Sequence, residues 1–143
     1  MNTSQDHHIG FLVQQISHLV IQLHNEKLEK EGVTSSQERL LTLLYINNGA
    51  TQSELQQDLL IKPSSVTKLI DVLEQKGLVT RIADSKDARV KIIHLSEKGQ
   101  LMEAKLWDIK KQMEERIAKS LSEEQQTQLV ELLKIVRRDV QQP

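Results

Sequence analysis

The residues best suited to binding chemistry lie in the middle of the chain, in residues 63–76, where apolar side chains recur at helical spacing. The apolar stripe consists of Val66, Leu69, Ile70 and Leu73. The opposite side and its flanks carry polar side chains, namely Ser64, Ser65, Thr67, Lys68, Asp71 and Gln75. A face with short hydroxyl side chains at a helix start can approach the major groove of duplex DNA closely, and the helix dipole favours phosphate there. Any surface helix has a polar outer face, so this segment alone leaves both interpretations open.

A polar loop at residues 83–89 supplies a second set of charges soon after that helix. We expect Lys86 and Arg89 at its tip to approach DNA, because an extended arginine is favoured in the negative potential of a narrow minor groove. Asp84 and Asp87 would repel phosphate, so we expect them to brace Arg89 and the loop by charge-assisted hydrogen bonds. Hairpin tips of mixed charge are common on protein surfaces. The DNA interpretation gains weight because this loop directly follows a helix-turn-helix pattern, in which a short capped helix from Thr51 precedes helix 63–76.

Composition limits the classes of protein to which the chain can belong. Its 143 residues are the usual length of a single domain. The net charge is −1, but residues 62–98 form a basic segment with 8 basic and 5 acidic side chains. Three aromatic residues are too few for a base-stacking platform of the kind that single-strand binders use. Because cysteine is absent, disulfides, thiol catalysis and thiol redox sensing by this chain are excluded.

Motifs of enzymes and of membrane or exported proteins are missing from the sequence. There is no G-x-S-x-G, no G-x-x-x-x-G-K and no metal triad, so we expect a protein that is not an enzyme and needs no cofactor. No apolar run is long enough to span a membrane, and the first residues do not have the pattern of a secretory signal. We therefore expect a cytoplasmic protein without a membrane partner.

Capping residues and apolar periodicity predict the elements that position these side chains. We expect a helix over residues 9–31, a second after Thr34 with a capping box to Gln37, and a short third from Thr51 to about Leu59. The fourth begins at Pro63 and ends at Gly77, where the periodicity changes to alternating β-branched residues. The remaining expected elements are a hairpin from 78–82 and 90–95, and long helices after Ser96 and Ser122. The first helix is apolar on more than one side, which indicates either the core or contact with a second chain.

Four motifs together resemble the MarR family of winged-helix transcriptional regulators. They are Ser64-Ser65-Val66-Thr67-Lys68-Leu69-Ile70-Asp71, Leu73-Glu74-Gln75-Lys76-Gly77-Leu78-Val79, Arg81 with Asp84, Asp87 and Arg89, and Leu95-Ser96-Glu97-Lys98-Gly99. The resemblance covers residues 33–99. It implies a mainly α fold: a winged helix-turn-helix with a small β-hairpin wing, plus long N- and C-terminal helices forming a dimerisation domain.

The resemblance also implies a function and its parts. Residues 33–98 would be the DNA-binding lobe, and residues 1–32 and 99–143 would interleave in a homodimer. The expected protein is a repressor of transcription that binds pseudo-palindromic double-stranded DNA, with helix 63–76 in the major groove and wing 79–95 in the minor groove. The expected groove contacts are Ser64, Ser65, Thr67 and Lys68 in the major groove and Arg89 in the minor groove. The wing tip of relatives often carries more basic residues than Lys86 and Arg89 supply.

Effector binding has several interpretations. Many relatives are released from DNA by small phenolic or amphipathic ligands, and His18 and Tyr45 are the residues that we associate with such a site; an interface histidine and a core tyrosine are the simpler readings. Zinc sensing is an alternative, because four of the five histidines lie in the first 24 residues, although no two of them have the i, i+4 spacing of a helical metal site. These histidines, with the nearby carboxylate, are His7, His8, His18, His24 and Glu26. A winged helix used for protein contact is a further alternative.

Overall fold

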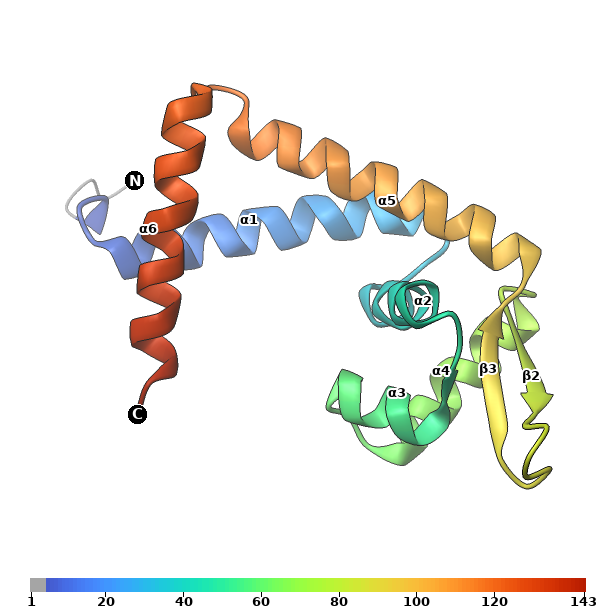
Figure 1. Cartoon of the computed structure of the whole chain (residues 1–143). Helices are drawn as coiled ribbons and strands as arrows, with labels where there is room; N and C mark the ends of the chain where they lie inside the picture. Colours follow the sequence, from blue (N-terminus) through green and yellow to red (C-terminus); the bar gives the residue numbers. More distant parts are fainter. Residues whose placement is uncertain (1–4) are drawn as a thin grey trace. The chain divides into compact units, whose positions relative to one another are not determined.

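The computed structural model describes residues 5–143, which form six helices and three short strands (Figure 1). In chain order these are α1 (Ile9–Lys30), α2 (Ser35–Asn47), β1 (Ala50–Thr51), α3 (Gln52–Leu59), α4 (Pro63–Gln75), β2 (Val79–Ala83), β3 (Lys91–Leu95), α5 (Glu97–Ala118) and α6 (Glu123–Gln141). The predicted order of four helices, a hairpin and two long helices is confirmed.

Side-chain caps fix several helix ends where the sequence predicts them. Thr34 and Gln37 form a reciprocal capping box at the start of α2, with both hydrogen bonds at 3.2 Å. Ser122 and Gln125 form the same arrangement at the start of α6, at 2.9 and 3.1 Å. In each box, side-chain oxygens accept from two backbone N–H groups that have no intrahelical partner at the start of the helix. At the end of α2, Asn48 adopts the left-handed conformation with φ 51°, which asparagine tolerates better than most residues.

The sheet has three antiparallel strands in the order β1–β3–β2. β2 and β3 form the predicted hairpin, with Arg81 opposite Ile93 and Ala83 opposite Lys91. β1 was not predicted: its two residues pair Ala50 with Ile93 on the other side of β3. Two residues are too short to show the alternation that identifies a strand in sequence. β3 is therefore the central strand, and β2 is an edge strand.

The described residues form two compact units, which divide between Ile109 and Lys110. In the first unit, leucine, isoleucine and valine side chains from α2, α3, α4 and the hairpin share one core, which includes Leu40, Leu41, Leu44, Leu55, Val66, Ile70, Leu73, Val79 and Ile93. Leu28 of α1 and Leu106 of α5 are buried in the same cluster. This core fixes α4 and the hairpin on one scaffold.

Two long helices leave much apolar surface uncovered in the single chain. None of the residues of α6 is buried, and its exposed apolar side chains include Leu129, Leu132, Leu133, Val136 and Val140. On α1 the exposed apolar residues are Ile9, Leu12, Val13, Ile16, Leu19 and Ile21. None of the helices in residues 5–143 is long and apolar enough to cross a membrane.

Candidate DNA-binding surface

α3 and α4 form a helix-turn-helix whose second helix is oriented by its buried stripe. The turn between them contains Leu60 in the left-handed conformation, with φ 56°, and Pro63 then occupies the first turn of α4. Val66, Ile70 and Leu73 are fully buried beneath α4. Because these residues face the core, the opposite side of the helix faces solvent.

The exposed side of α4 presents fewer free hydroxyl groups than its sequence indicates. Ser64 and Lys68 are exposed and Ser65 is half-buried. The Thr67 hydroxyl donates to the carbonyl oxygen of Pro63 at 3.0 Å and accepts from Nε2 of Gln52 at 2.6 Å. Thr67 therefore links α4 to the start of α3. Gln52 was missed at the sequence level, because no pattern pairs an α3 amide with a hydroxyl 15 residues later.

Hydrogen bonds from carboxylates organise the tip of the wing. Oδ1 of Asp84 accepts from the backbone N–H of Lys86 at 3.3 Å. Asp87 accepts three bonds from Arg89: from the backbone N–H at 3.0 Å, from Nε at 3.1 Å and from one terminal guanidinium nitrogen at 3.3 Å. The Arg89 side chain remains 91% exposed. Asp87 therefore binds Nε and one terminal nitrogen of the guanidinium, while the rest of this group is open to solvent.

The same contacts change the acidity of Asp87. The guanidinium of Arg89, and then its backbone N–H, lower the pKa of Asp87 below the ordinary value of 3.8. Both donors stabilise the ionised carboxylate. Asp87 is therefore negatively charged at neutral pH, the state in which it accepts these bonds.

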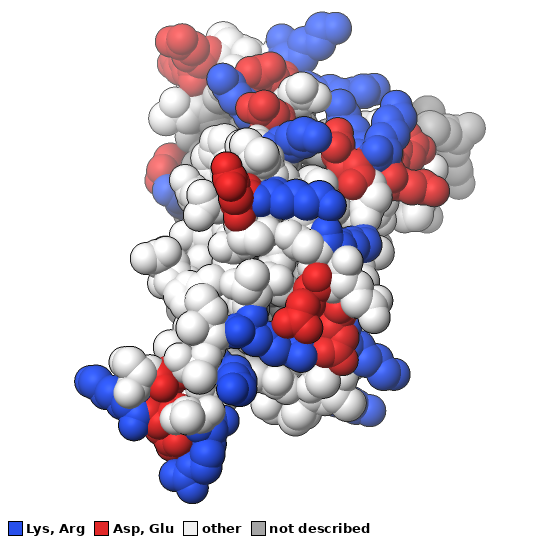
Figure 2. All heavy atoms as spheres, turned by 90° about the vertical axis from the view of Figure 1, so that its right-hand side faces the viewer, with Lys and Arg blue, Asp and Glu red and all other residues white. Residues whose placement is uncertain are grey.

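A cationic hollow lies where α4, the start of α3 and the hairpin meet. Its volume is about 520 Å³, and its lining includes Gln52 and Thr67 with the three cations Arg81, Arg89 and Lys91. The guanidinium of Arg81 binds the carboxylates of Asp71 and Glu74 on α4. Figure 2 shows the projecting lower tip of the molecule with Lys and Arg side chains around a smaller group of acidic ones. Basic side chains therefore lie both in this hollow and at the tip of the wing.

The candidate effector residues lie apart in sequence and are both exposed. Tyr45 is 63% exposed, so the interpretation of Tyr45 as a core residue is wrong: it lies on the outer side of α2. It lines a cavity of about 480 Å³ together with Trp107 and Ala104 of α5. His18 is exposed on α1 and is not among the residues lining this cavity.

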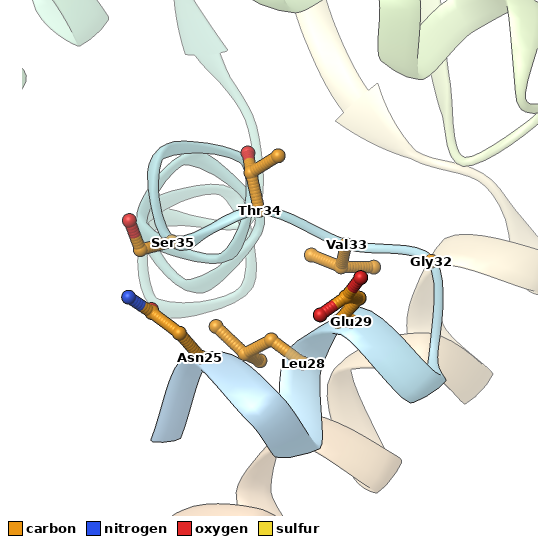
Figure 3. A pocket seen from close by; sticks show the side chains of 7 residues that line it. All are labelled: Asn25, Leu28, Glu29, Gly32, Val33, Thr34 and Ser35. Carbon is orange, nitrogen blue, oxygen red and sulfur yellow. The ribbon is translucent and has the colours of Figure 1, made fainter. Parts of the chain in front are cut away.

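A smaller cavity of about 360 Å³ lies at the corner between α1 and α2 (Figure 3). Asn25, Leu28 and Glu29 of α1 approach it from one side, and Thr34 and Ser35 from the other. Neither candidate effector residue lines this corner. Since Thr34 also caps α2, the cavity belongs to the turn that connects the two helices.

The histidines considered as zinc ligands do not converge. Nε2 of His24 lies 2.9 Å from Oε1 of Glu38 and 3.0 Å from Oε2, so it donates to a carboxylate that is only 6% exposed. His7 and His8 are exposed before the start of α1. In residues 5–143 no group of three or more His, Asp or Glu residues is arranged to hold a metal ion. This geometry offers the zinc alternative no support.

Comparisons with known proteins agree on one family. The model of the MarR family matches residues 33–91. The chain is 34% identical over 103 residues to the HTH-type transcriptional repressor MdtR of Bacillus subtilis (strain 168), which covers 72% of this chain and 66%, just under two thirds, of that repressor. A mutant of S. aureus MepR has a TM-score of 0.85 at 30% identity, covering 93% of this chain and 98% of that one. The S. aureus MepR–DNA complex has a TM-score of 0.74 at 29% identity, covering 96% and 100%.

Proposed function

The chain belongs to the MarR family of transcriptional regulators and is not an enzyme, and from this premise we propose that it is a homodimeric repressor that binds pseudo-palindromic duplex DNA. The observation that carries this proposal is the presence of exposed basic side chains on two elements, α4 and the wing, that share one core. Lys68 is exposed on α4, and Arg89 is 91% exposed on the wing. Both elements pack on one hydrophobic core.

In the proposed complex, helix 63–76 enters the major groove and wing 79–95 enters the minor groove. Ser64 and Ser65 reach base edges or nearby phosphates, and Lys68 binds phosphate. The Thr67 hydroxyl already binds Gln52 and the carbonyl oxygen of Pro63. Its contribution to the major-groove contact is therefore to hold Gln52 beside the start of α4. On the wing, Arg89 enters the minor groove with Lys86 beside it. Support comes from the similarity to MepR, a structure of which contains DNA.

The proposed homodimer accounts for the uncovered apolar side chains of α1 and α6. Monomeric proteins rarely expose contiguous apolar patches larger than a few hundred Å². Residues 1–32 and 99–143 would supply the dimer interface, leaving residues 33–98 as the DNA-binding lobe of each subunit. A twofold dimer presents two such lobes, and this is the symmetry that a pseudo-palindromic site matches.

Repression and release by a ligand complete the proposal. The repressor MdtR, to which the chain is 34% identical, supports the sign of regulation. We expect a small amphipathic or phenolic compound to release the DNA, with Tyr45 and His18 as candidate contacts. The cavity beside Tyr45 and Trp107 has the aromatic lining that such a compound would contact.

Selection of bound duplexes from a random library tests the proposed function directly. We expect a recovered sequence with two related half-sites about one helical turn apart, bound by two chains. Sedimentation of the free protein at micromolar concentration should give a dimer of the 16.4 kDa chain. Recovery of no sequence preference would contradict operator binding, and a purely monomeric species would contradict the homodimer. Repeating the binding with phenolic compounds tests release.

A further inference from the structure

We propose that Arg81 is a positioning residue: through Asp71 it holds the wing against the recognition helix and thereby sets the separation of the two DNA-reading elements. This inference rests on the proposed function for its meaning, but the contact itself joins two elements of the free protein. One terminal nitrogen of Arg81 binds Oδ1 of Asp71, and the other lies 3.6 Å from Oε1 of Glu74. Asp71 and Glu74 are three residues apart, so they lie on the same side of α4.

The position of Arg81 makes this contact a link between the middle of α4 and the wing. Arg81 lies in the centre of β2, opposite Ile93 of β3. Because β2 is an edge strand, its backbone pairs only with β3 on one side. In the part of the chain that the structure describes, the hydrogen bond and ion pairs of Arg81 join the side chains of α4 to the strands of the hairpin.

The pairing of β3 with β1 and the burial of Ile93 fix the central strand of the hairpin, and hydrogen bonds of Ser96 fix its base. The Ser96 hydroxyl donates to the carbonyl oxygen of Gly77 at 2.5 Å, and the backbone N–H of Ser96 donates to Leu78 at 3.0 Å. These bonds lie at the opposite end of the hairpin from the tip that carries Arg89. Beyond this base, the edge strand β2 is joined to α4 by the side chain of Arg81. A planar guanidinium with donors in a fixed fork suits this role better than a flexible ammonium group.

The charges distinguish positioning from direct phosphate binding. The side chain of Arg81 is 31% exposed, against 91% for Arg89. Its single positive charge faces two carboxylates, so the group as a whole is negative and would repel a phosphate. If Arg81 bound phosphate directly, removing the charge of Asp71 would strengthen DNA binding. If Arg81 positions the wing through Asp71, the same removal would weaken it.

The expected magnitude follows from the exposure of the pair. A partly exposed ion pair changes the equilibrium between wing positions only modestly. The apparent affinity for DNA falls in proportion to the fraction of molecules whose wing leaves the position that binds DNA. We therefore expect Asp71→Asn and Arg81→Gln each to weaken binding to the selected duplex by about two- to fivefold. Glu74→Gln, at the longer distance, should have a smaller effect.

The decisive experiment is a double-mutant cycle with a charge exchange, measured by fluorescence anisotropy on the selected duplex at several salt concentrations. We expect Asp71→Asn combined with Arg81→Gln to bind no more weakly than either single variant. The exchange of Asp71→Arg with Arg81→Asp should regain most of the lost affinity, and Arg81→Gln should leave the salt slope unchanged. The matched control Asp58→Asn removes a carboxylate of α3 and should not reproduce the loss. Tighter binding by Asp71→Asn, a slope reduced by about one in Arg81→Gln, or additive losses would overturn the proposal.

A second measurement needs no DNA, so its outcome is independent of the proposed function. Because the chain has no cysteine, spin labels placed through Ser64→Cys and Ser85→Cys are the only two in each chain. Labelled chains diluted with an excess of unlabelled chains report the distance between α4 and the wing tip within one chain. We expect a broader distance distribution in Asp71→Asn and Arg81→Gln, and the original distribution in the exchanged pair. Unchanged distributions in both single variants would overturn the positioning role. If the unmodified protein binds no duplex, the proposed function fails but this result still stands.

Discussion

Replacement of Arg89 by alanine should weaken operator binding while leaving the fold and the dimer intact. Its side chain is 91% exposed, so its removal opens no cavity in the core. The loss of one specific contact costs about 1–3 kcal/mol, which is roughly a 5- to 150-fold rise in Kd. The other basic residue of the wing tip is Lys86, whose backbone N–H binds Asp84 and whose side chain could replace part of the lost charge.

Asp87→Ala separates two physical accounts of the same loop. Simple electrostatics predicts tighter binding, because a negative charge near phosphate is removed. The three hydrogen bonds from Arg89 to Asp87 predict the reverse, because without them the guanidinium must be ordered when DNA binds. We expect Asp87→Ala to show part of the loss seen in Arg89→Ala. The double variant should bind little worse than Arg89→Ala alone, since the carboxylate then has no arginine to hold.

The unmodified protein, Arg89→Ala, Asp87→Ala and the double variant are titrated against one fluorescent operator duplex at fixed salt. The four Kd values give the coupling between Arg89 and Asp87. Thermal unfolding of each variant checks that the fold is unchanged. Tighter binding by Asp87→Ala would refute the bracing role of this carboxylate. Unchanged binding by Arg89→Ala would refute the wing as a DNA contact.

Three further predictions concern the recognition helix, the pH dependence of the Asp87 contact and the start of α5. Lys68→Ala should weaken binding to operator and random duplexes equally and reduce the salt slope by about one, whereas Ser65→Ala should change sequence preference more than affinity; equal effects of the two variants in anisotropy titrations would contradict this division. Because the pKa of Asp87 is lowered below 3.8, its bracing is present above that value and is lost only as the pH falls through the lowered pKa. The affinity difference between the unmodified protein and Asp87→Ala should therefore stay constant from about pH 5.5 to 8. A difference that shrinks within this range would refute the claim that the ionised carboxylate of Asp87 braces Arg89. A Cβ on Gly99 would lie 2.0 Å from a backbone carbonyl oxygen, so Gly99→Ala should lower the free energy of unfolding by about 1–3 kcal/mol in urea titrations. The control Gly10→Ala, whose Cβ meets nothing within 4 Å, should not be destabilised, and equal stability of the two variants would contradict the clash.

Much of the fold could be predicted because its boundaries are local. Capping residues such as Thr34 and Ser122, and the proline that opens α4, act within one helical turn, so the sequence around them contains the whole signal. The hairpin was predicted for the same reason, from alternating β-branched residues on either side of a polar loop. The bonds between Asp87 and Arg89 join residues two apart, and they also lie within reach of local reasoning.

Contacts that depend on the angle between elements could not be predicted. Asp71 lies on the outward face of α4, and in sequence it counts among the groups open to solvent. Only the folding back of β2 brings Arg81 to it, across ten residues and a change of secondary structure. The engaged hydroxyl of Thr67 likewise depends on how α3 crosses α4. β1 is defined by its pairing with the edge of β3 opposite β2, and its own two residues give no indication of a strand.

The measurement that tests the central claim most directly is the salt dependence of binding to the selected duplex and to a scrambled duplex of equal length. If two winged helices read the operator, the selected duplex should bind two chains with a Kd well below that of the scrambled one. Both affinities should fall steeply as salt rises, because lysine and arginine displace counterions from the phosphates. Equal affinity for the two duplexes, or an affinity that does not respond to salt, would contradict the assignment of α4 and the wing as an operator-reading surface.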